Sequence, residues 1–138
     1  GVAASPNPVL GWVGSLSELD LTKGYWVSMS ESDDISITAN EPPGHLDLTY
    51  SLSPGANLIS FPFVGLYNLQ DVLPDELVWV TTGIIGEGVA ASNVNGQFLG
   101  SLTQFEGGKG YWFKVTDSIE FQFVMPEDRQ TTTPSKIK

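Results

Sequence analysis

The sequence contains no cysteine, which excludes disulfides, thiol catalysis and thiolate metal sites. Its single histidine, His45, leaves a catalytic triad or a histidine metal site without identifiable partners. Basic residues are scarce: six stand against sixteen acidic ones, giving a net charge of −10 at pH 7. Because phosphate backbones are bound through clustered Lys and Arg, we expect neither nucleic acid nor an anionic membrane surface as a partner.

Long hydrophobic runs are also absent. The apolar stretch at residues 57–66 is far too short to span a bilayer, so membrane insertion is not expected. At 138 residues with 41% hydrophobic content, the chain has the size and composition of one globular domain.

What the chain does contain is an internal repeat. Residues 1–5 (Gly-Val-Ala-Ala-Ser) recur as residues 88–92, and residues 14–26 align without a gap on residues 100–112, with seven of thirteen positions identical. A period this long fits a duplicated small domain rather than a solenoid. We expect the C-terminal half of a first repeat, a Pro-rich linker, a complete second repeat and a polar tail, at residues 1–39, 40–45, 46–125 and 126–138. The chain would then be part of a larger repetitive protein.

Fifteen glycines and nine prolines separate short β-type runs, which predicts an all-β fold of small sandwich-like or barrel-like units with an internal duplication. Strands are expected at residues 12–13, 24–29, 35–38, 46–52, 57–64, 77–82, 84–85, 97–102, 110–115 and 119–124. Pro62 predicts a strand that lies at an edge, is bulged or ends there. One short helix is expected at residues 68–73, with Asn68 as its N-cap and Pro74 as its stop.

The motif Lys-Gly-Tyr-Trp occurs at residues 23–26 and again at 109–112. Its glycine allows the backbone to turn or another chain to approach closely. Tyr and Trp then point to opposite faces of the strand that follows, so that one ring is buried and the other lies on the outer face. The repetition favours a packing role over ligand binding.

Residues 54–62 (Pro-Gly-Ala-Asn-Leu-Ile-Ser-Phe-Pro), followed by residues 107–113 (Gly-Gly-Lys-Gly-Tyr-Trp-Phe), resemble an extracellular β-module. That module occurs in tandem in large secreted or surface proteins of marine bacteria and in marine phage proteins. The resemblance covers residues 46–124 and implies an extracellular or cell-surface location, or a place in a virion. The module usually has Trp at the position of Ala56, so a ligand platform built on that ring would be missing here.

Two sets of side chains are candidates for binding. Glu31, Asp33 and Asp34 form an acidic turn that could supply oxygen ligands to calcium, the one cofactor considered, although no EF-hand pattern is present. A solvated acidic turn is the competing interpretation. Aromatic rings could instead stack on sugar faces, or fill the core. The platform candidates are Trp12, Trp26, Tyr111 and Trp112.

No nucleophile–base pair is legible, so an enzyme is not expected. The favoured interpretation is a non-catalytic extracellular structural or adhesive module from a larger repetitive protein. Carbohydrate binding through a Trp/Tyr platform is one alternative, and a phage fibre or decoration component is another. Because the first repeat lacks its Asn-Leu-Ile-Ser strand, residues 1–38 should have an unfilled sheet edge or core face. We expect that edge to pair with the complete repeat, with other modules of the parent protein, or with another copy of the chain.

Overall fold

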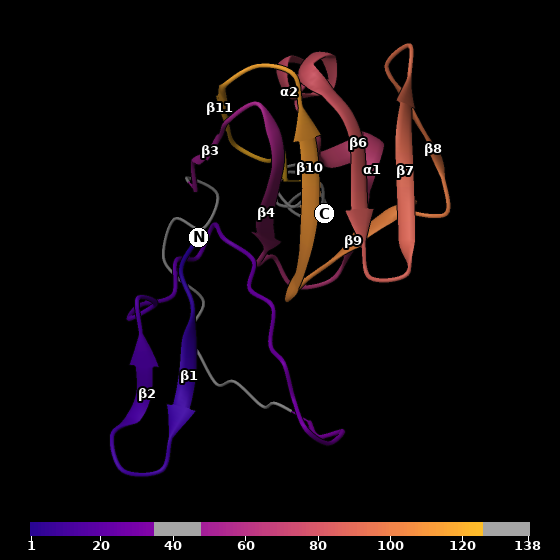
Figure 1. Cartoon of the computed structure of the whole chain (residues 1–138). Coiled ribbons are helices and arrows are strands. Elements are labelled where there is room, and N and C mark those ends of the chain that lie inside the picture. Colours follow the sequence, from indigo (N-terminus) through magenta and orange to yellow (C-terminus); the bar gives the residue numbers. More distant parts are fainter. Residues whose placement is uncertain (35–47, 126–138) are drawn as a thin grey trace, which may run out of the picture.

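A computed structural model describes residues 1–34 and 48–125 of the chain, and these form an all-β fold, as predicted (Figure 1). The expected strand at 35–38, the linker at 40–45 and the tail at 126–138 lie outside the described residues. No helix in the described part of the chain is long and apolar enough to cross a membrane.

The main sheet has five antiparallel strands in the spatial order β4-β10-β6-β7-β8. These strands are β4 (Gly55–Phe61), β6 (Thr81–Gly86), β7 (Val89–Val94), β8 (Gln97–Gly100) and β10 (Lys109–Val115). The second strand of this order, β10, pairs with β4 over seven residues and with β6 on its other side, where the register shifts. β4 is therefore an edge strand of this sheet.

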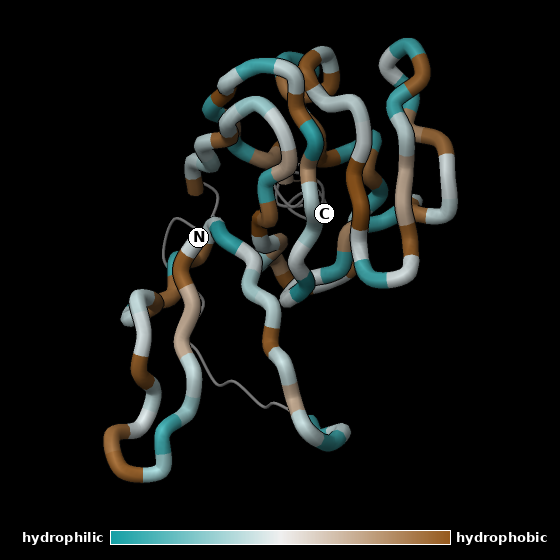
Figure 2. Tube along the Cα trace, in the orientation of Figure 1, coloured by the Kyte–Doolittle hydropathy of each residue, from teal (hydrophilic) through white to brown (hydrophobic). Residues whose placement is uncertain are grey.

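Three two-stranded ladders complete the strand pairing. β3 (Tyr50–Leu52) pairs with β11 (Ile119–Phe121), and β5 (Leu66–Asn68) pairs with β9 (Gln104–Glu106). The third, β1 (Ala4–Asn7) with β2 (Gly11–Gly14), is a hairpin that projects away from the rest of the fold (Figure 1). Hydrophobic residues occur on this projecting hairpin as well as on the strands of the main body (Figure 2).

The buried residues form a hydrophobic core that is rich in aromatic rings. Phe61 stacks on Phe105 with ring centroids 5.1 Å apart, and Tyr50 stacks on Phe121 at the same separation. Every described residue of this core falls between positions 50 and 125, within the predicted complete repeat. Residues 1–34 contribute no buried hydrophobic side chain to it.

The helical segment differs from the prediction. α1 (Leu69–Val72) confirms the expected short helix, with Asn68 at the N-cap position but without a side-chain capping bond. The strand expected at 77–82 is wrong: α2 (Asp75–Val80) occupies most of it, and β6 begins only at Thr81. Pro74 provides the N-cap of α2, two acidic residues fill its first turn, and Leu77 is fully buried. Tertiary burial of that one face overrides the β propensity of its valines.

Two expectations about strand pairing have opposite outcomes. The effect of Pro62 is confirmed, because β4 ends at Phe61 and lies at a sheet edge. The strand expected at residues 24–29 is wrong, since these residues form no ladder and the single bridge nearby, between Lys23 and Ile59, lies just before them. A β-strand needs a neighbouring strand to pair with, and among residues 21–29 only Lys23 has such a pairing.

Candidate functional site

The two copies of the repeated sequence fold locally in the same way. We call residues 1–39 the first half-repeat and residues 88–125 the matching half-repeat. Their hairpins share one register, with Ala4 opposite Gly14 in the first and Ala91 opposite Gly100 in the second. The next hydrogen bond recurs as well: the amide of Leu16 or Leu102 donates to an alanine carbonyl at 3.0 Å. The hairpin is therefore built by local sequence.

A tyrosine closes the following loop in both copies. The amide of Asp20 donates to the Tyr25 hydroxyl oxygen at 2.8 Å, and the amide of Glu106 donates to that of Tyr111 at the same distance. A local difference lies at the hairpin tip, where the first half-repeat has an extra residue. There the Asn7 side chain accepts from the amides of Val9 and Leu10 at 2.9 Å.

The first half-repeat joins the main body at the outer edge of β4. The amide of Gly24 donates to the carbonyl of Leu58 at 3.2 Å, and the amide of Ser60 donates to the carbonyl of Thr22 at 3.1 Å. The Ser60 hydroxyl also donates to the carbonyl of Leu21. We call this contact of residues 21–24 with β4 the junction. It satisfies backbone groups that an edge strand otherwise presents to any other chain.

The glycines of the two Lys-Gly-Tyr-Trp motifs approach each other at the junction. A Cβ atom on Gly24 would lie 2.8 Å from Leu58 Cγ, too close to be accommodated without movement. A Cβ on Gly110 would lie 3.6 Å from the Cα of Gly24. Close approach of a second chain segment is therefore one reason for glycine in this motif.

A small polar groove of about 310 Å³ lies along the junction, lined from one side by Asp20, Thr22 and Lys23. Hydrogen bonds from the Thr22 hydroxyl and amide, at 2.7 and 2.8 Å, lower the pKa of the Asp20 carboxyl. On the body side, burial raises the pKa of Tyr50 to about 12, and the charge of Asp20 acts in the same direction. The Tyr50 hydroxyl donates to the carbonyl of Ser60 at 3.1 Å.

The first half-repeat exposes side chains whose counterparts are in the core. Leu19 is 73% exposed, whereas its counterpart Phe105 is fully buried. Val27 is 61% exposed and aligns with Phe113, which is also fully buried. Met29 is likewise exposed and aligns with the buried Val115, and we call Leu19, Val27 and Met29 together the apolar face. The described residues of the first half-repeat therefore do not form a second packed unit.

The predicted aromatic platform is divided between surface and core. Trp12 and Trp26 are 71% and 78% exposed, from β2 and from the segment after the junction. Trp112 is half-buried. Tyr111 is a correction: it is buried in the core with its ring 4.9 Å from Phe105, so it presents no face to a sugar. Trp79 is not among the four platform candidates, yet it is 75% exposed on α2.

The predicted calcium ligands Glu31, Asp33 and Asp34 are exposed and border a shallow groove with Val27 and Met29. A carboxylate oxygen of Asp33 accepts from the amide of Asp34 at 2.8 Å, so part of its capacity is used locally. Across residues 1–34 and 48–125, no three His, Asp or Glu side chains are grouped so that they could hold a metal ion.

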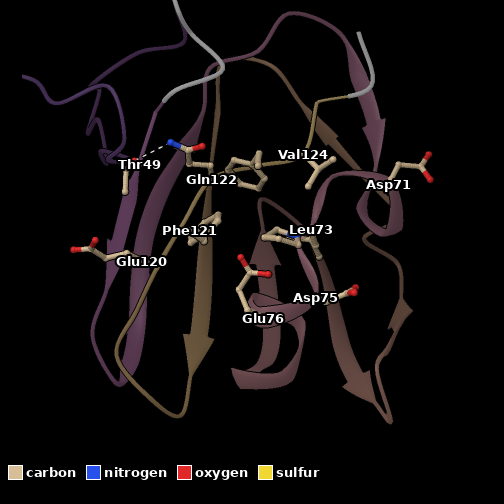
Figure 3. A pocket seen from close by; sticks show the side chains of 11 residues that line it. Thr49, Asp71, Leu73, Asp75, Glu76, Glu120, Phe121, Gln122 and Val124 are labelled. Atoms are coloured by element: carbon tan, nitrogen blue, oxygen red, sulfur yellow. Dashed lines mark hydrogen bonds between the residues drawn. The ribbon is translucent and has the colours of Figure 1, made fainter. Parts of the chain in front are cut away.

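A second acidic groove, of about 700 Å³, lies on the main body where the helices meet β11 (Figure 3). Its carboxylates are Asp71, Asp75, Glu76 and Glu120, and they point in different directions around an apolar floor that includes Leu73 (Figure 3). The carboxylates are solvated and carry no basic partner in the lining.

Comparison with known proteins gives no match: no family model, no curated protein and no solved structure is significantly similar to this chain.

Proposed function

We propose that this chain is a structural module of a larger repetitive protein, in which successive repeats are joined through backbone pairing at a sheet edge. The observation that carries the proposal is the junction, where Gly24 and Thr22 hydrogen-bond to the outer edge of β4. A contact made by backbone groups and by a close glycine approach depends little on side-chain chemistry, as a repeated connection between units requires. The proposed role of the module is to join neighbouring repeats, and no catalytic role is proposed.

The acidic surface agrees with an exposed, soluble location for such a module. A net charge of −10 makes the chains repel one another, so non-specific association is disfavoured and specific pairing determines association. The proposal therefore includes an extracellular or cell-surface setting, in which the repeats separate or present other domains.

The junction is tested by amide hydrogen exchange on the full chain and on a Gly24→Val variant. In the parent chain the Ser60 amide should be protected, because it donates to Thr22 across the junction. Valine at position 24 would collide with Leu58, so Ser60 should exchange at least about tenfold faster. Ser28→Val, at an exposed position of the same segment, is the matched control and should leave Ser60 protected.

An unprotected Ser60 amide in the parent chain would contradict the proposal directly. So would a Gly24→Val variant whose Ser60 amide is as protected as that of the control, because the junction would then not depend on the close approach of Gly24.

Carbohydrate binding is the second candidate function, and the exposure of Trp12 and Trp26 favours it. Exposed planar rings can stack on sugars, as the platform interpretation requires. A glycan array and a calcium titration, both read by thermal shift, separate the two functions. A saturable glycan signal that is lost in Trp12→Ala or Trp26→Ala but kept in Gly24→Val would replace the structural role by carbohydrate binding.

A further inference from the structure

The apolar face has a buried counterpart elsewhere in the same chain. Leu19, Val27 and Met29 correspond by sequence to Phe105, Phe113 and Val115, and these three counterparts are at most 5% exposed. The hairpin and the tyrosine-closed loop that precede these positions recur in both copies, whereas the strand β10 has no counterpart ladder at residues 24–29. The two copies thus share their local turns and differ in the strands that pack against them.

The structure shows what covers the counterparts. Residues 48–87 supply β4 and β6, which pair with the two sides of β10, and Phe61, which stacks on Phe105 at 5.1 Å. β6 also pairs with β7, placing Ile84 opposite Ala91. Phe121 and Phe123 of the matching half-repeat also pack on Phe113, so residues 48–87 supply part of the cover, including both strands that flank β10.

We propose that the apolar face of the first half-repeat binds a polypeptide segment with the pattern of residues 48–87, that is, the opening half of a repeat without a closing half of its own. This inference rests on the proposed function and names the partner that the module takes. The bound segment places an Asn-Leu-Ile-Ser-Phe-Pro strand beside residues 25–29, and its apolar side chains cover Leu19, Val27 and Met29.

The junction leaves the required strand edge open. Backbone groups of successive residues in an antiparallel strand point alternately to opposite sides. Thr22 and Gly24 face β4 of the main body at the junction, so in a strand that continues from them Tyr25 and Val27 present their N–H and C=O groups on the other edge. The counterparts of these two residues, Tyr111 and Phe113, pair with Ile59 and Asn57 of β4. The β4-like strand of an incoming segment can therefore pair on this edge while the junction stays intact.

A second intact copy of this chain is a poorer occupant than such a segment. Its own residues 48–87 already pair with β10 and bury the ring of Phe61, so they would have to leave a folded core before docking elsewhere. Removing a buried aromatic ring from its contacts is strongly unfavourable, and removing a whole half-core is more unfavourable still.

The test adds the missing segment to the full chain. A second copy of residues 48–87 is fused before Gly1, so that Glu87 of the added segment precedes Gly1 as Glu87 precedes Gly88 in the chain. We expect the amides of Tyr25 and Val27 to exchange at least about tenfold more slowly than in the unfused chain, approaching those of Tyr111 and Phe113. Unchanged exchange at residues 25–29 would overturn the proposal.

Val27→Asp supplies the specific variant, because the side chain is exposed in the unfused chain and would be buried by the segment. In the fusion it should abolish the added protection, while in the unfused chain it should leave stability unchanged. Val9→Asp is the matched control: Val9 is 88% exposed at the hairpin tip, and the fusion should tolerate the substitution. Equal effects of the two variants in the fusion would overturn the proposal.

Three further readouts keep the outcomes distinct. The amide of Phe113 reports that the main body is folded in every variant, and the amide of Ser60 reports the junction. Loss of Ser60 protection with gain at Val27 would contradict the proposed function but not the segment binding. Sedimentation of the unfused chain tests the other occupant: a stable dimer that protects Val27 without any added segment would assign the apolar face to a second copy and overturn the proposal.

Discussion

Tyr50 is a titratable side chain of the main body whose pKa is raised by folding. It is 1% exposed, stacks on Phe121, and donates its hydroxyl proton to the carbonyl of Ser60 in the edge strand that carries the junction. Burial disfavours the phenolate, which raises the pKa of this side chain to about 12 from an ordinary value of 10.0. The residue thus couples the stability of the fold to alkaline pH.

We predict a loss of stability at high pH that depends on Tyr50. Because the folded pKa lies above the unfolded one, the contribution is fully present below pH 10 and is lost as pH rises from 10 toward about 12. The loss should amount to about 2 kcal/mol in the free energy of unfolding, measured by urea denaturation. Tyr50→Phe should cost about 1 kcal/mol at pH 7 through the missing hydrogen bond and should remove this alkaline loss. An identical alkaline slope in Tyr50→Phe would show that other groups cause it.

At the scale of elements, the β-hairpin is a unit that the sequence builds twice and the fold uses in two ways. β7 and β8 extend the five-stranded sheet and bury Ala91 against the core, whereas β1 and β2 stand outside it with their side chains largely exposed. Both hairpins end at a glycine with the same unusual backbone, φ +147° at Gly14 and +148° at Gly100. This pair allows local and tertiary contributions to be separated.

Alanine substitution at the two glycines should have different consequences. A Cβ would lie 2.2 Å from the Ala3 carbonyl oxygen at position 14 and 2.3 Å from that of Ala90 at position 100, so local strain is equal. Gly100→Ala should lower the free energy of unfolding of the main body by about 1–3 kcal/mol, since its hairpin is part of the sheet. Gly14→Ala should leave the global value within about 0.5 kcal/mol and loosen only its own hairpin, as seen by exchange of the Leu16 amide. Equal global losses would mean that the first half-repeat unfolds together with the body.

At the scale of the whole molecule, charge and packing have separate roles. Sixteen acidic residues against six basic ones give a surface of one dominant sign, while the core is made from aromatic and aliphatic side chains of residues 50–125. The described ion pair between Lys109 and Glu106 is long, at 3.9 Å, and solvent-exposed, so it contributes little. Repulsion between carboxylates is therefore the main long-range electrostatic effect.

Added salt should stabilise this chain at pH 7. Raising sodium chloride from about 0.01 M to about 0.5 M shortens the Debye length from roughly 30 Å to under 8 Å, which screens repulsion between surface carboxylates. The thermal midpoint should rise steadily over this range without a sharp step. A saturable rise with calcium at constant ionic strength would instead indicate a specific cation site at Glu31, Asp33 and Asp34. A midpoint that falls with sodium chloride would contradict the repulsion argument.

Much of the local structure follows from neighbouring residues alone. The hairpins, the tyrosine-closed loops, the edge position enforced by Pro62 and the short helix before Pro74 each depend on contacts within a few residues. The strand predicted at 77–82 failed for the opposite reason. The helix forms there because Leu77 is buried in a core assembled from distant segments. The local pattern of valines predicts a strand because it contains no information about that burial.

The amino-acid sequence alone specifies the all-β class, the repeated motif and the recurrence of its hairpin and tyrosine-closed loop, because turns and hairpins are controlled by short-range backbone preferences. The tertiary structure alone decided which copy is buried. Tyr111 and Phe113 lie in a core because residues 48–87 pack against them, while Val27 lies in solvent and Gly24 lies against β4. A side chain is buried only when a second surface packs against it. The sequence shows which residues are apolar, but it does not show which distant segments come into contact.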